Sequence, residues 1–285
     1  MKCCLAYGVA GDNMEITVSA SDNINGTLIL PMYEGVEEIP EEYERGLPQG
    51  MKSQINRVLA DGDFKAKKKA TMSLIGGEDG KVILAGLGKS DGVSVHDFRK
   101  SGAAVFASIK KVHGNDFTVR FTEAGVAHMA AFADGMMLRN YSYDEYKMKD
   151  DEETEGEKQV RLTCSEKESE ELSALVNKYR GITKGVHLSR DLGNCPPNDM
   201  YPEVFADMAW EWAKDFDNVD VTIINYEQAI KAGMGGLVAV GKGSSRKPCM
   251  VIFEMNKSVK GRCPVLVGKG ITFDTGGISL KPGAN

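Results

Sequence analysis

Short apolar runs alternate with amphipathic stretches along most of this chain, and this alternation constrains the fold more than any other feature. In the first half the runs are mostly β-favouring and end at turn residues, which is typical of strands buried within a sheet. Between them lie stretches with apolar side chains at helical spacing. The expected strands are residues 27–30, 72–75, 81–85, 117–121 and 160–164, and the expected helices are residues 97–112 and 123–138. The pattern predicts an α/β fold.

The domain organisation follows from one long helical pattern and the proline-rich turn after it. Residues 166–188 repeat apolar side chains at helical spacing over a length that suits a connecting helix. The pair Pro196-Pro197 ends that helix, because proline lacks a backbone donor and disfavours helical dihedrals in the residue before it. We therefore predict an N-terminal α/β domain at 1–165, a connecting helix at 166–190 and a second domain at 191–285.

The second domain repeats the alternation. A helix is expected from Pro202 to Lys214, with proline in its first turn. The strands expected after it are residues 219–224, 237–240, 250–253 and 265–267. Such an order predicts a largely parallel sheet, whose ligands lie at the carboxyl ends of the strands.

Composition excludes several classes of function. Charged residues make up 27% of the chain and the formal net charge is −6, so no large basic face for nucleic acid is expected. No segment approaches the roughly 18 apolar residues of a membrane span, and the N-terminus has no apolar signal core. The six cysteines form no CxxC pair, which favours reduced thiols. We expect a soluble cytoplasmic protein.

Three common site motifs are incomplete. Gly88-Lys89-Ser90 has the ending of a phosphate loop, but the position five residues before Gly88 is Ile83 where the motif requires glycine. The four histidines are scattered without an HExxH pair that could hold zinc. No GxSxG turn for a nucleophilic serine is present. The sequence therefore supports neither nucleotide binding by this loop, nor a histidine zinc site, nor a serine hydrolase.

The informative stretch is residues 264–281. An apolar run, expected to be a buried strand, leads into a glycine-rich turn that carries Lys269, Asp274 and Lys281. Polar side chains at the carboxyl end of a strand can point into one crevice, and the glycines allow tight turns and close backbone approach. A lysine–aspartate salt bridge in a surface loop would give the same pattern. Spacing alone leaves both interpretations open.

The motif GKGITFDTGGISLK (268–281) resembles the metal-binding signature of the leucyl aminopeptidase family, the hexameric cytosol aminopeptidases. Other family segments are similar in the same order along the chain. They are VILAGLGKSDGVSVHDFRKSGAAVFASIKK (82–111), FADGMMLRNYSYDEYKMK (132–149), SRDLGNCPPNDMYPEVFA (189–206) and AIKAGMGGLVAVGKGSSRKPCMVIFEM (229–255). The similarity covers nearly the whole chain and implies a macro-domain-like N-terminal sheet followed by the start of an α/β aminopeptidase catalytic domain.

The resemblance also implies a reaction. Lys269 and Asp274 match the first two ligands of a pair of divalent metals, Zn, Mn or Mg, with Asp274 bridging both ions. A lysine ligates only as the neutral amine, so its pKa must fall far below roughly 10.4, as two nearby dications would ensure. Lys281 matches the catalytic lysine, which stabilises the oxyanion during hydrolysis. The implied activity is release of N-terminal residues, preferably leucine and other apolar ones, from peptides with a free N-terminus by a homo-hexamer.

The family pattern extends beyond the sequence. Relatives add an aspartate shortly after the position of Lys281, and then a segment with two further carboxylate ligands and an arginine that holds bicarbonate. The sequence stops at Asn285, before these positions. We therefore expect an incomplete catalytic domain, and no turnover from these 285 residues alone. The alternative is a non-catalytic family member that acts as a binding or assembly module.

Overall fold

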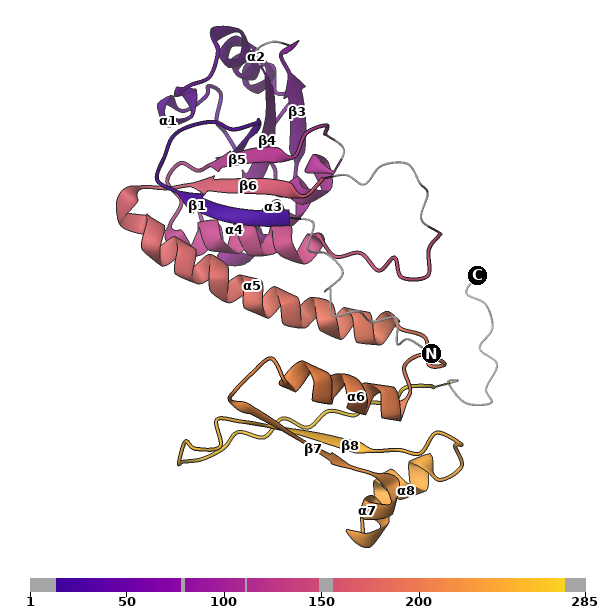
Figure 1. Ribbon diagram of the computed structural model, residues 1–285. Coiled ribbons are helices and arrows are strands. Elements are labelled where there is room, and N and C mark those ends of the chain that lie inside the picture. The colour runs from indigo at the N-terminus through magenta and orange to yellow at the C-terminus, as the bar shows by residue number, and fades with distance from the viewer. Residues whose placement is uncertain (1–13, 78–79, 111, 149–155, 275–285) are drawn as a thin grey trace. The chain divides into compact units, whose positions relative to one another are not determined.

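The computed structural model describes residues 14–77, 80–110, 112–148 and 156–274 (Figure 1). The chain divides into two compact units between Asp191 and Leu192, and each unit is described by itself. Among the described residues, no helix is both long enough and apolar enough to cross a membrane.

The described residues of the first unit form a six-stranded sheet in the order β1-β6-β5-β2-β4-β3. All neighbouring strands are parallel except β3, which pairs with β4 in the antiparallel sense. The strands are β1 (Met14–Ser19), β2 (Thr27–Tyr33), β3 (Thr71–Ile75), β4 (Lys81–Gly88), β5 (Asp116–Arg120) and β6 (Lys158–Thr163). The five predicted strands of this half are confirmed, whereas β1 was missed.

Helices cover the two faces of this sheet (Figure 1). On one face α3 (Val95–Ile109), α4 (Val126–Arg139) and α5 (Glu166–Asn194) share a buried apolar core with the strands. On the other face α1 (Glu41–Glu44) and α2 (Gln49–Ala60) pack over β2, β4 and β3 around a second core. The predicted helices at 97–112, 123–138 and 166–188 correspond to α3, α4 and α5.

Two glycines bring α3 and α4 together. A methyl group on Gly135 would lie 1.8 Å from the carbonyl oxygen of Arg99, and one on Gly102 would lie 2.0 Å from the carbonyl oxygen of Phe132. Beside this contact Arg99 donates to the buried carboxylate of Asp134, whose other oxygen accepts from Thr183 of α5. Helices α3 and α4 are therefore in close main-chain contact, and the buried carboxylate of Asp134 links both of them to α5.

The glycines of β4 have a similar structural role. A methyl group on Gly86 would lie 2.0 Å from the carbonyl oxygen of Lys67, and one on Gly88 would lie 2.4 Å from Cγ of Lys68. Residues 66–70 exchange backbone hydrogen bonds with these two glycines. The Gly86-Leu87-Gly88 sequence thus lets a loop lie directly against β4, which accounts for glycines that otherwise suggested part of a phosphate loop.

The described residues of the second unit from Pro202 onward form an antiparallel pair of strands and three helices. The elements are α6 (Pro202–Ala213), β7 (Val219–Ile224), α7 (Tyr226–Lys231), α8 (Gly235–Gly241) and β8 (Met250–Met255). Strands β7 and β8 pair from Val219 with Met255 to Ile224 with Met250. Helix α6 contacts both strands, and the ring of Trp212 packs edge-on against Phe253 with centroids 5.7 Å apart.

Two strand predictions in this unit are wrong. Residues 237–240 lie in α8, because a left-handed turn at Gly233 leads directly from α7 into a second short helix. A four-residue apolar run does not distinguish helix from strand by periodicity. Residues 265–267 form no strand, and they are exposed. The described part of this unit therefore has an antiparallel pair where a largely parallel sheet was expected.

Candidate functional site

The predicted metal ligands lie in the irregular segment that follows β8. Residues 261–274 contain neither helix nor strand, and the side chains of Lys269 and Asp274 are both exposed. Lys281, the predicted catalytic residue, lies outside the described residues. The structure places the two predicted ligands five positions apart on one segment, and their assigned roles stay predictions.

The run before these ligands is also exposed. Val265, Leu266 and Val267 have relative exposures of 77%, 98% and 90%. The prediction of a buried strand at this point is therefore wrong for the described structure. An apolar run becomes a buried strand only when neighbouring strands pair with it and other elements cover it. Among the described residues, β8 pairs with β7 alone, and residues 265–267 pair with no strand.

The described residues do not by themselves fit a pair of metal ions. Among them no three His, Cys, Asp or Glu side chains come together as a possible metal site. A site for two divalent cations requires several converging ligands, and the carboxylates that suit Mg or Mn are strongly preferred among them. Lys269 and Asp274 can supply only part of such a set.

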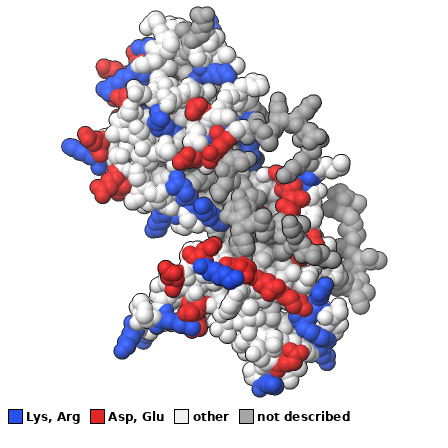
Figure 2. Space-filling model, viewed as in Figure 1, with Lys and Arg blue, Asp and Glu red and all other residues white. Residues whose placement is uncertain are grey.

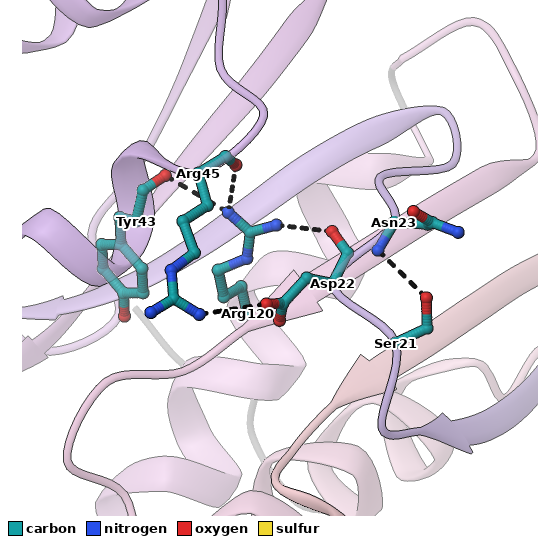
Figure 3. Close-up of polar contacts among 6 residues, drawn as sticks. All are labelled: Ser21, Asp22, Asn23, Tyr43, Arg45 and Arg120. Carbon is teal, nitrogen blue, oxygen red and sulfur yellow. Dashed lines mark hydrogen bonds and ion pairs between the residues drawn. The ribbon is translucent and has the colours of Figure 1, made fainter.

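The first unit contains a buried polar cluster that the sequence did not reveal (Figure 3). Arg120 ends β5, and only 4% of its surface is exposed. Its guanidinium donates to the carbonyl oxygens of Asp22 (2.9 Å), Tyr43 (3.3 Å) and Arg45 (2.6 Å). Burial lowers the pKa of the Arg120 guanidinium from its ordinary value. Arg120 therefore attaches the segment after β1 and the end of α1 to the C-terminal end of β5, an internal strand of the sheet.

Tyr43 extends this cluster to β2. The hydroxyl of Tyr43 donates to the carbonyl oxygen of Pro31 and accepts from the backbone N–H of Thr122 at 3.2 Å. Burial raises the pKa of Tyr43 well above its usual value of 10, so the phenol stays neutral. The Tyr43 hydroxyl therefore both donates to and accepts from main-chain groups, which is a structural role. The hydrogen bonds of Arg120 and Tyr43 therefore stabilise the first unit.

A second polar cluster lies at the C-terminal end of α5. Tyr141 donates from its hydroxyl to Oδ1 of Asp191 at 2.9 Å, and its ring lies 5.2 Å from that of His187. The Arg190 guanidinium lies 5.0 Å from the Tyr141 ring centroid and donates to the carbonyl oxygen of Leu138. Burial raises the pKa of Asp191. These contacts attach the last turns of α5 to the end of α4 and to Tyr141 just after it.

Comparison with known families decides where this fold belongs. Residues 29–150 match the model of the N-terminal domain of the cytosol aminopeptidase family, and residues 187–285 match the model of its catalytic domain. The chain belongs to the cytosol aminopeptidase family. Lys269, Asp274 and Lys281 all lie within the part that matches the catalytic domain.

Relatives with curated names agree with this assignment. A probable cytosol aminopeptidase of Agrobacterium fabrum is 38% identical over 242 residues, which are 80% of this chain and 47% of that protein. One from Rhizobium etli is 32% identical, over 95% of this chain and 55% of that protein. The chain thus spans about half the length of the curated relatives that it matches.

Solved structures share the fold. A mutant of tomato leucine aminopeptidase superposes with a TM-score of 0.76 at 23% identity, covering 92% of this chain and 55% of that one. The bottromycin maturation enzyme BotP in complex with Mn gives a TM-score of 0.61 at 21% identity, covering 80% of this chain and 44% of that one. The expected α/β fold, with an N-terminal and a catalytic domain of this family, is confirmed.

Proposed function

We propose that this chain forms the N-terminal part of a metal-dependent aminopeptidase that releases leucine and other apolar residues from the N-termini of peptides. The observation that carries the proposal is the position of the GKGITFDTGGISLK stretch within the match to the family's catalytic domain. The names of the matched relatives support the same class of activity.

The roles of individual residues belong to this proposal. Lys269 and Asp274 would be ligands of two divalent ions, Zn, Mn or Mg, which supply charge stabilisation at the scissile carbonyl. Lys281 would keep its charge and stabilise the oxyanion that forms on that carbonyl. Further chain, of the kind that the longer relatives carry, would supply the remaining ligands and a bicarbonate site. The same added chain would provide neighbours for the apolar run at 265–267.

The assembly and cellular location are proposed on the same basis. We propose a homo-hexamer in the cytoplasm, acting on peptides and binding neither nucleic acid nor membrane. The surface in Figure 2 supports the absence of a nucleic-acid partner, because Lys and Arg side chains are interspersed with Asp and Glu over the face shown. The names of the relatives support the cytoplasmic location. Sedimentation velocity on the full-length protein tests the hexamer.

The decisive experiment uses a protein extended by C-terminal chain of the kind that the longer relatives carry. After metal addition, it should hydrolyse a chromogenic leucyl amide. Lys281→Ala should retain the metal content of the parent and lose activity by about 10²–10³-fold, the usual effect of removing one oxyanion donor. Lys260→Ala is the matched control, because Lys260 is an exposed lysine in the same irregular region. Its activity should equal that of the parent.

Two outcomes would overturn parts of this proposal. Full activity in Lys281→Ala would remove the role given to that lysine. Absence of leucyl amide hydrolysis by the extended, metal-loaded protein would refute the proposed aminopeptidase activity.

A second function is favoured by the lack of a converging ligand set in the described residues. In this alternative the 285-residue chain is a non-catalytic binding or assembly module. It predicts that the purified 285-residue chain shows no turnover above a blank that contains metal alone, yet binds complete subunits. Chelator-sensitive turnover by these 285 residues would exclude the alternative.

A further inference from the structure

We draw no further inference here: the strongest candidate, the exposed apolar segment of residues 265–267 that continues to Ile271 and Phe273 in the second unit, belongs to the metal-binding stretch already described, and nothing in the structure shows what covers it.

Discussion

The contact between α3 and α4 predicts a large effect from one added methyl group. In Gly135→Ala the new Cβ would lie 1.8 Å from the carbonyl oxygen of Arg99, 2.7 Å from its carbonyl carbon and 3.1 Å from the backbone nitrogen of Ala103. All three atoms belong to the main chain of α3, so no side-chain rotation relieves the clash. The two helices must separate, or the variant cannot keep the native packing.

The size of the effect follows from two opposing contributions. Overpacking a well-packed core costs about 1–3 kcal/mol, and a clash with main chain belongs at the upper end of that range. Replacing glycine by alanine inside a helix returns about 1 kcal/mol through helix propensity. We therefore expect Gly135→Ala to lower the free energy of unfolding by about 2 kcal/mol.

A second glycine provides the control. Gly181 lies inside α5, and apart from its chain neighbours and the nearby backbone of its own helix, no heavy atom that the structure describes lies within 4 Å of the position a Cβ would take. Gly181→Ala should therefore raise the free energy of unfolding by about 0.5–1 kcal/mol, the propensity gain alone. The same glycine-to-alanine change is thus expected to alter the free energy of unfolding in opposite directions at two positions of one unit.

Urea denaturation followed by far-UV circular dichroism measures both variants, because α3, α4 and α5 contribute much of the helical signal. Tryptophan fluorescence reports separately on the second unit, since both tryptophans lie in α6. The midpoint seen by circular dichroism should fall for Gly135→Ala and rise for Gly181→Ala. Equal stability of Gly135→Ala and the parent would refute the close main-chain contact between α3 and α4.

Two further predictions concern the polar contacts of the first unit. Arg120→Met should destabilise the protein by about 3 kcal/mol because three carbonyl oxygens lose a charged donor, whereas Arg45→Met, which removes only an exposed ion pair with Asp22, should change stability by less than about 1 kcal/mol. Similar urea midpoints for the two variants would contradict the anchoring role of Arg120. At the start of α3, hydrogen bonds from Lys68 and Ser94 lower the pKa of Asp97 to about 2. Because this folded-state pKa is depressed, the stability that the carboxylate contributes is present above its unfolded pKa and is lost as the pH falls from about 4 to about 2. The urea midpoint of Asp97→Asn should therefore lie below that of the parent at pH 7 and approach it near pH 2, and a difference independent of pH would contradict the assignment.

Most strands and helices of the first unit were predicted correctly because each carries a clear apolar pattern within its own short stretch of sequence. The strand at Thr27–Tyr33 is buried on both faces, so it shows a continuous apolar run. The predicted helix at 97–112 began two residues inside α3, because the prediction did not use the capping box of Ser94 and Asp97. Strand β1 was missed because only Ile16 among its residues is buried, which leaves a weak apolar signal. Helix α2 was missed as well, although Met51, Ile55, Val58 and Leu59 form its buried face.

The polar clusters could not have been predicted from local pattern. Arg120 lies 98 positions from Asp22 and 75 from Arg45, so its partners are determined by the crossing of distant segments. In the sequence, Arg120 is one charged residue at the end of a strand. Its near-complete burial, which makes it important for stability, becomes visible only when the sheet is assembled.

The geometry of the candidate metal site depends even more strongly on segments that are far apart in the sequence. Lys269 and Asp274 were identified from a sequence motif, which requires only residues that are close together in the sequence. Ligand geometry needs several segments at once, and a strand needs partners before it can position a side chain at its carboxyl end. The exposure of Val265, Leu266 and Val267 shows that the described residues do not supply those partners. Family identity can therefore be read from half of the relatives' length, whereas the catalytic geometry is a property of the whole domain.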